Sequence, residues 1–320
     1  MTILTIVLAA VAVQVADTVA PAAAVESPHT IRSAGLELAG TLAIPRGVTK
    51  PVPVVVIIAG SGPTDRNGNS AMGIRPNSYA QLAWRLAERG IASLRYDKRS
   101  LPGTQGTFDI MKMTLADFAA DARAAAESLS RDRRFSRVGF LGHSEGASLA
   151  LIAAGQGAPV FGVIHVSGLG RRTSEVLREQ LSRQFDSVTL VRYDTAMKHY
   201  LLGEQPADVP PQLAMLFVPV NRTFMGSMMA FDPPAAIRAV RQPVLIVQGQ
   251  TDLQARVVDA ERLHAARPDA KLVVIPSANH VLKQVTDTTL PGQLPSYQNP
   301  GLPIMPEVVN AIADWILKLK

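Results

Sequence analysis

Short runs of consecutive apolar residues, rich in valine and isoleucine, recur along the chain. A run that is apolar at every position is typical of a strand buried on both faces of a parallel sheet. Six such runs cover residues 54–59, 92–96, 138–141, 162–166, 244–247 and 271–275. Two further strands are expected within residues 29–44, on either side of a turn at Ala34 and Gly35. The pattern therefore predicts a sheet of eight strands.

Segments with helical spacing lie between these runs, at residues 79–89, 115–129, 146–154 and 308–319. Thr114 precedes one of them as a candidate N-cap, and Gly90 follows another as a candidate C-cap. Strands that alternate with helices indicate an α/β fold, with a mainly parallel central sheet flanked by helices. Residues 287–303 contain several prolines and glycines and are expected to form a loop.

Residues 173–234 interrupt the alternation, because they contain no run typical of a parallel-sheet strand. Residues 174–185 and 195–202 have helical spacing. Methionines and phenylalanines occupy positions 215, 217, 224, 225, 228, 229 and 231. Such adaptable surface suits an apolar substrate cleft, although the same residues could simply pack the segment onto the body. We expect a helical lid inserted after the sixth strand, and a core domain made of residues 25–172 and 235–320.

The N-terminus has the pattern of a secretory signal peptide. Residues 3–16 are nearly all apolar, and Pro-Ala-Ala-Ala at residues 21–24 gives an A-x-A cleavage pattern. The run is shorter than the roughly 20 residues that span a bilayer, and no other segment is long and apolar enough to do so. The first basic residue is Arg32, which leaves an uncleaved anchor or an early start codon as alternatives. We expect residues 1–24 to be a signal peptide and the protein to be exported to the periplasm or the exterior.

Composition excludes several classes of protein. Hydrophobic residues make up 47% of the 320 residues and charged residues 18%, which suits a large buried core rather than a disordered chain. The net charge of +6 is scattered and forms no basic stripe with aromatics, so nucleic acid is not an expected partner. There are no cysteines, hence no disulfide and no thiol nucleophile. No metalloprotease helix motif, P-loop or dinucleotide fingerprint occurs, so no metal or organic cofactor is predicted.

The motif Gly-His-Ser-Glu-Gly at residues 142–146 carries the strongest chemical signal. It lies directly between the apolar run 138–141 and the small-residue helix 146–154, which is the strand–turn–helix context that G-x-S-x-G requires. The sharp turn would expose the Ser144 hydroxyl above the sheet, and the helix N-terminus would favour negative charge beside it. Ser144 is therefore the candidate nucleophile, and an incidental serine in a glycine-rich turn is the alternative.

This motif in its context resembles the α/β-hydrolase superfamily, and in particular its esterase and serine-aminopeptidase-like branch. The resemblance extends over residues 31–320 and is weakest in the lid. The family orders its triad as serine, acid and histidine. Asp252 matches the family's G-x-x-D after the strand at 244–247, and His280 matches the histidine in the loop after the last strand. The resemblance implies that Asp252 is the acid and His280 the base; Asp252 could also act as a helix N-cap, and Asp259 is a poorer candidate.

The resemblance also implies an oxyanion hole made of two backbone N–H groups. One belongs to Glu145, and the other to Ser61 in a loop that resembles the family's H-G-x-G motif, with Ala59 where histidine is common. Further along this loop, Asp65 and Arg66 are expected to brace it, with substrate contact as the alternative.

The expected function is hydrolysis of carboxylic esters of small to medium size through an acyl-enzyme intermediate. Peptidase, thioesterase and acyltransferase activities need the same triad and remain alternatives. A non-catalytic binding protein on the same fold is a further one. A small-molecule ester is the only partner predicted, and the oligomeric state is left open.

Overall fold

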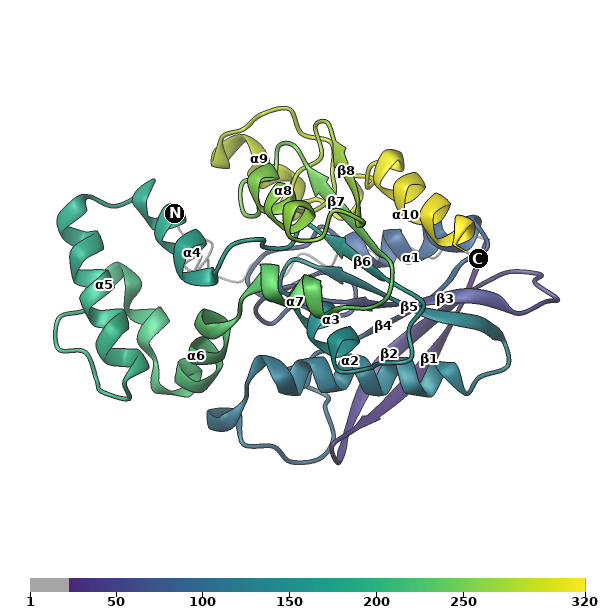
Figure 1. The fold of residues 1–320 in the computed structure, drawn as a ribbon, viewed down its shortest axis with the longest axis horizontal. Helices are drawn as coiled ribbons and strands as arrows, with labels where there is room; N and C mark the ends of the chain where they lie inside the picture. The colour runs from purple at the N-terminus through teal and green to yellow at the C-terminus, as the bar shows by residue number, and fades with distance from the viewer. Residues whose placement is uncertain (1–22, 320) are drawn as a thin grey trace.

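The computed structural model describes residues 23–319, so residues 1–22 of the predicted signal peptide lie outside the described residues. The described chain forms an eight-stranded sheet in the order β1-β2-β4-β3-β5-β6-β7-β8 (Figure 1). Its strands are β1 (Ala24–Ser33), β2 (Leu36–Pro45), β3 (Val52–Ile58), β4 (Ala92–Tyr96), β5 (Phe135–His143), β6 (Val163–Val166), β7 (Val244–Gly249) and β8 (Lys271–Ile275). The strands β3 to β8 are parallel to their neighbours among one another, and the β1–β2 and β2–β4 pairs are antiparallel. The predicted mainly parallel α/β sheet is thereby confirmed.

Helices cover both faces of the sheet because successive strand residues point to opposite sides. Val54, Val56 and Ile58 of β3 belong to one buried cluster with residues of α2 (Leu115–Ser130), α3 (Glu145–Gly155) and α8 (Val257–Ala266) on this face. Val55 and Ile57 pack on the other face with α1 (Ser78–Glu88) and α10 (Pro306–Lys318). This three-layer packing explains why the central strands read as unbroken apolar runs (Figure 1).

Parallel strands place their carboxyl ends at one edge of the sheet, where α/β proteins bind ligands. The loops after β3, β5, β7 and β8 leave from this edge. Each of these loops, or the turn that follows the strand, carries one of the predicted site residues. The topology therefore gathers residues that are up to about 220 positions apart in the sequence.

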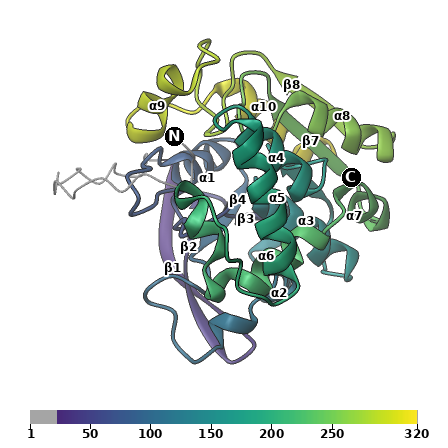
Figure 2. The ribbon, with the colours of Figure 1, turned by 90° about the vertical axis from the view of Figure 1, so that its left-hand side faces the viewer.

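The segment between β6 and β7 is helical. It contains α4 (Thr173–Ser182), α5 (Ser187–Leu201), α6 (Arg222–Ala230) and α7 (Pro233–Ala239), with short 3₁₀ turns at Pro211–Phe217 and Pro219–Asn221. The helices α4 to α6 extend to the left of the sheet in Figure 1, and lie in front of it when that side is viewed in Figure 2. Tyr200, Phe217 and Met229 belong to the insertion's own buried cluster, whereas Phe224 and Met228 pack against the main core. These residues therefore have packing roles.

Two further features complete the fold. The segment 287–303, expected to be a loop, contains the helix α9 (Leu290–Gln298), so that expectation was wrong in part. Its first turn is capped by the Thr289 hydroxyl, which accepts the Gly292 N–H at 3.2 Å. Within residues 23–319, no helix combines the length and apolar character needed to cross a bilayer.

Candidate active site

Ser144 lies at a strained turn between β5 and α3. Its φ of 56° and ψ of −123° are rare for a residue with a side chain, and such outliers cluster at functional sites. The flanking glycines are required by close packing. A Cβ on Gly142 would lie 2.2 Å from the Gly146 carbonyl oxygen, and one on Gly146 would lie 2.1 Å from that of Ile58. The motif therefore adopts the elbow geometry that its glycines predict.

Asp252 and His280 are joined by a hydrogen bond of 2.8 Å between His280 Nδ1 and Asp252 Oδ2. The Asp252 carboxylate is buried, and its Oδ1 accepts the backbone N–H groups of Gln254 at 2.8 Å and Ala255 at 3.1 Å. A carboxylate accepts rather than donates, so His280 Nδ1 carries the proton and Nε2 holds the free lone pair. His280 is thereby prepared to accept a proton at Nε2.

The structure brings the His280 loop against the turn at Ser144 through His143, the residue before it. His143 Nε2 lies 2.8 Å from the His280 carbonyl oxygen, and the two rings are 4.8 Å apart. Ser144 and His280 form no direct side-chain hydrogen bond in the described chain. Such bonds are often long before substrate binds.

The loop after β3 packs directly on the turn at Ser144. A Cβ on Gly60 would lie 3.1 Å from Ser144 Cβ, so this close approach needs glycine. The Gly60 N–H is already engaged by the Tyr79 hydroxyl at 3.0 Å. The next N–H, that of Ser61, donates no hydrogen bond within residues 23–319. The Glu145 N–H, at the first position of α3, is one of those that a helix leaves without an intrahelical partner.

The sequence matches the alpha/beta hydrolase family over residues 55–282, which is more than half of the chain. The chain belongs to the α/β-hydrolase family. A curated relative of this chain is esterase EstD of Thermotoga maritima, which is 28% identical over 286 residues. That alignment covers 88% of this chain and 66% of EstD, slightly less than two thirds of the relative.

Solved structures share the fold of this hydrolase. Est1E from Butyrivibrio proteoclasticus superimposes with a TM-score of 0.57 at 18% identity, over 91% of this chain and 98% of Est1E. The Pyrococcus furiosus esterase Pf2001 gives a TM-score of 0.57 at 13% identity, over 92% of this chain and 93% of that one. At these identities the likeness shows the common architecture.

Two residues of the hydrolase that the sequence analysis left without a role lie inside the site. The Tyr79 hydroxyl is 2.8 Å from His143 Nδ1, and both side chains are buried. Burial, followed by the nearby charge of His280, lowers the pKa of His143 to about 3. Position 143 could have been noticed within the nucleophile motif, but Tyr79 resembles any aromatic residue at the start of a core helix.

A buried ion pair lies beside the turn at Ser144. Lys98 Nζ is 2.7 Å from Glu145 Oε1, and both side chains are buried. Among the described residues, Glu145 Oε2 has no hydrogen-bond partner. Lys98 therefore offsets a carboxylate that belongs to the same residue as the predicted oxyanion donor.

The loop after β3 is braced as expected. Arg66 binds Asp97 through its backbone N–H at 2.9 Å and through its guanidinium at 2.5 Å. Asp65 Oδ1 accepts the backbone N–H groups of Asn67 and Asn69, each at 2.8 Å. These contacts hold the loop onto the β4 turn.

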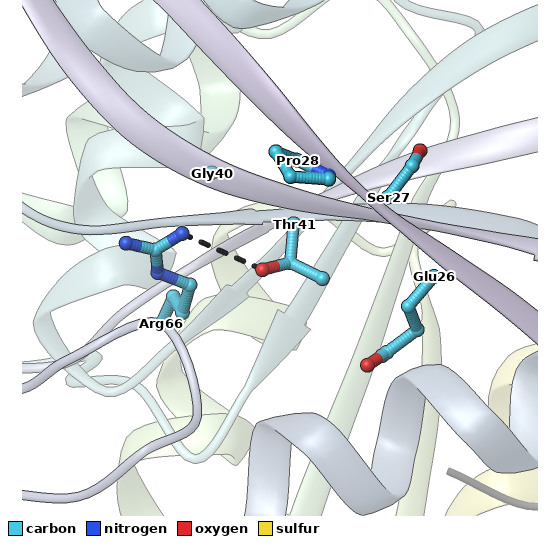
Figure 3. A pocket seen from close by; sticks show the side chains of 6 residues that line it. All are labelled: Glu26, Ser27, Pro28, Gly40, Thr41 and Arg66. Atoms are coloured by element: carbon cyan, nitrogen blue, oxygen red, sulfur yellow. Dashed lines mark hydrogen bonds between the residues drawn. The ribbon is translucent and has the colours of Figure 1, made fainter.

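One pocket of the described structure lies apart from these residues. A pocket of about 170 Å³ lies on the β1–β2 hairpin, where Arg66 approaches Thr41 at 3.4 Å (Figure 3), and it contains none of the predicted site residues. Within residues 23–319, no group of three or more histidine, aspartate or glutamate side chains could hold a metal ion.

Proposed function

We propose that this α/β-hydrolase is a serine esterase that cleaves carboxylic esters of small to medium size through an acyl-enzyme. Ser144 is the nucleophile, His280 the general base and Asp252 the residue that orients the base. The observation that carries the proposal is the 2.8 Å Asp252–His280 hydrogen bond beside a serine held at φ 56°. The curated esterase relative supports an ester as the substrate.

In the acylation step, His280 Nε2 accepts the Ser144 hydroxyl proton while Oγ attacks the ester carbonyl carbon. The carbonyl electron pair moves to oxygen and forms a tetrahedral oxyanion. Collapse of this intermediate breaks the C–O bond to the alcohol, which leaves with the proton from His280. A water molecule then repeats the sequence on the acyl-enzyme and releases the acid.

The oxyanion would be bound by the backbone N–H groups of Ser61 and Glu145. Both belong to segments that adjoin Ser144, and losing one such donor typically lowers kcat by about 10² to 10³. Lys98 contributes by offsetting the Glu145 carboxylate, which would otherwise oppose negative charge on the substrate. The helical insertion between β6 and β7 serves as the lid in this proposal, because it leaves β6 at the same edge of the sheet.

Export is a separate part of the proposal and rests on the sequence of residues 1–24. Cleavage after Ala24 would remove only the first residue of β1, which pairs with Pro45, and would leave the β1–β2 pairing from Val25 to Ser33 in place. N-terminal sequencing of protein recovered from the native host's exported fraction checks this part. A protein found only inside the cell with Met1 or Thr2 at its start would contradict it.

The test of the enzymatic part is hydrolysis of p-nitrophenyl esters from acetate to dodecanoate by the parent protein and by Ser144→Ala. We expect turnover by the parent and less than about a thousandth of that rate in the variant. The chain-length optimum would then size the acyl site. Equal activity in both proteins would refute the role of Ser144. A parent inactive on every ester but active on peptide or thioester substrates would transfer the proposal to those classes.

A further inference from the structure

A directed chain of hydrogen bonds connects the three loops around Ser144. The Gly60 N–H, in the loop after β3, lies 3.0 Å from the Tyr79 hydroxyl oxygen of α1. That oxygen lies 2.8 Å from His143 Nδ1, and His143 Nε2 lies 2.8 Å from the His280 carbonyl oxygen. Tyr79, His143 and His280 are exposed by only 4%, 6% and 5%. These hydrogen bonds are therefore all shielded from water.

The direction of each bond follows from the chemistry of its ends. The His280 carbonyl can only accept, so His143 Nε2 carries a proton. The pKa of His143, lowered to about 3, keeps its ring neutral, so Nδ1 is unprotonated and accepts the Tyr79 hydroxyl proton. Burial raises the pKa of Tyr79, which keeps that proton in place. The Tyr79 oxygen in turn accepts from Gly60, and every group in the chain is satisfied.

The series of hydrogen bonds determines which N–H group of the loop after β3 can bind an oxyanion. Because the Gly60 N–H is used by Tyr79, the first N–H of the loop that is free to meet a substrate is that of Ser61. The Tyr79 hydroxyl fixes the peptide unit just before it, while Gly60 itself packs against Ser144 Cβ. At the other end, His143 Nε2 binds the backbone carbonyl of His280, and His143 is the residue directly before Ser144.

We propose that Tyr79 and His143 are positioning residues that hold the oxyanion loop and the base loop in register with Ser144. This inference rests on the proposed esterase function, and neither residue touches the reacting atoms. Oxyanion donors act only when they lie within about 2.7–3.1 Å of the developing charge. A displacement of about 1 Å can therefore cost about 10²-fold in rate. A neutral His143 also avoids a second positive charge beside His280 when the base is protonated.

The test compares Tyr79→Phe with Tyr96→Phe. The two tyrosines are both 4% exposed, and Tyr96 belongs to β4 in the core, so the control removes the same atom at the same depth. We expect Tyr79→Phe to lower kcat on a p-nitrophenyl ester by about 10- to 100-fold, a milder loss than removal of an oxyanion donor. KM should change by less than about threefold, because the loss is specific to the transition state. Tyr96→Phe should keep the parent kcat.

Two spectroscopic measurements address the same chain without turnover. Imidazole ¹⁵N NMR of the parent should show His143 as the Nε2–H tautomer between pH 5 and 8. Amide exchange at Gly60 should be at least about tenfold faster in Tyr79→Phe than in the parent, since its acceptor is removed. An Nδ1–H tautomer or unchanged Gly60 exchange would overturn the inference.

The kinetic outcomes separate this inference from the proposed function. If Ser144→Ala is inactive while Tyr79→Phe keeps its kcat within twofold and only loses thermal stability, the inference fails and the esterase stands. If the parent hydrolyses no ester, the proposed function fails, and the tautomer and Gly60 exchange still decide whether the hydrogen-bond chain exists as described.

Discussion

Replacing Asp252 by asparagine tests how the buried carboxylate controls the base. In the structure, Oδ1 accepts two backbone N–H groups, and Oδ2 accepts His280 Nδ1–H at 2.8 Å and, at a longer 3.4 Å, the Gln248 side-chain amide. Asparagine has one acceptor oxygen and one donor group in these two places. Its oxygen will stay with the two N–H groups, because turning the amide would face donors with donors. The amide N–H₂ then points at His280 Nδ1 and makes that atom an acceptor.

The result is the wrong histidine tautomer. With Nδ1 unprotonated, the proton moves to Nε2, which can no longer accept the Ser144 proton. The same exchange in a well-studied serine protease lowers kcat by about 10⁴ with geometry intact. We expect a loss of similar size here, with little change in KM, measured as p-nitrophenyl butyrate hydrolysis at pH 7.5.

Asp259→Asn is the matched control because Asp259 is the competing acidic residue. Asp259 is fully buried and binds the Arg171 guanidinium at 3.0 Å, away from His280. This variant should lose more thermal stability than Asp252→Asn but keep kcat within about threefold. If Asp252→Asn retained more than about a tenth of the parent kcat, or if Asp259→Asn were the inactive variant, the tautomer reasoning would be refuted.

Three further predictions concern stability. His165 is fully buried in β6 and burial lowers its pKa to about 4, so the unfolded chain binds an extra proton below about pH 6.5. Between pH 6.5 and 5, the free energy of unfolding of the parent should fall by about 1.6 kcal/mol more than that of His165→Leu in denaturant titrations, and an equal fall in both proteins would contradict this. Burial without a carboxylate partner lowers the pKa of Lys283 to about 7, so this lysine destabilises the fold fully below pH 7 and less as pH rises toward 10.5. Lys283→Met should therefore raise Tm at pH 7 and raise it less at pH 9. An increase in Tm that grows with pH would contradict this. Lys98→Met leaves the Glu145 carboxylate buried and unpaired, so it should lower the free energy of unfolding in urea by about 3–5 kcal/mol. The double variant Lys98→Met/Glu145→Gln should recover most of this loss. A double variant no more stable than Lys98→Met would show that the unpaired charge is not the cause.

The strands β3 to β7 were predictable because burial on both faces makes them mainly apolar, whereas β8, at the edge of the sheet, is apolar although it is only partly buried. β4 and β8 have the bounds that the apolar runs predicted, and β3, β5, β6 and β7 differ from their predicted bounds by one to three residues at an end. β1 instead begins at Ala24, five residues before the predicted start. Its burial pattern alternates, and Pro28 stands in an edge strand where a missing N–H is tolerated, so no hydrophobic run marks it.

Helices fixed by tertiary contacts were not predictable. α9 contains Pro295 and Gly292, which both weaken helices. It is held by Gln293, which donates to the Thr251 carbonyl at 2.6 Å, and by Ser296, which accepts from Asn279 at 2.7 Å. These partners are distant in sequence, so local propensity gave no sign of the helix.

The candidate site also has residues that the sequence predicted and a residue that it did not. The order of Ser144, Asp252 and His280 was implied by the family resemblance of short motifs at strand ends, and the observed Asp252–His280 hydrogen bond agrees with that expectation. The function of Tyr79 depends on how α1, β3 and β5 meet, which no single segment encodes. Its hydroxyl could be assigned only when the distances to Gly60 and His143 were known.

The most direct measurement of the central claim is covalent labelling of the parent protein with a fluorophosphonate, followed by peptide mapping by mass spectrometry. We expect one adduct, on Ser144, that forms in the parent, is absent from Ser144→Ala and slows by about 10³-fold or more in His280→Ala. An adduct on another serine, or equal labelling of Ser144 in the His280 variant, would contradict an activated nucleophile at this turn.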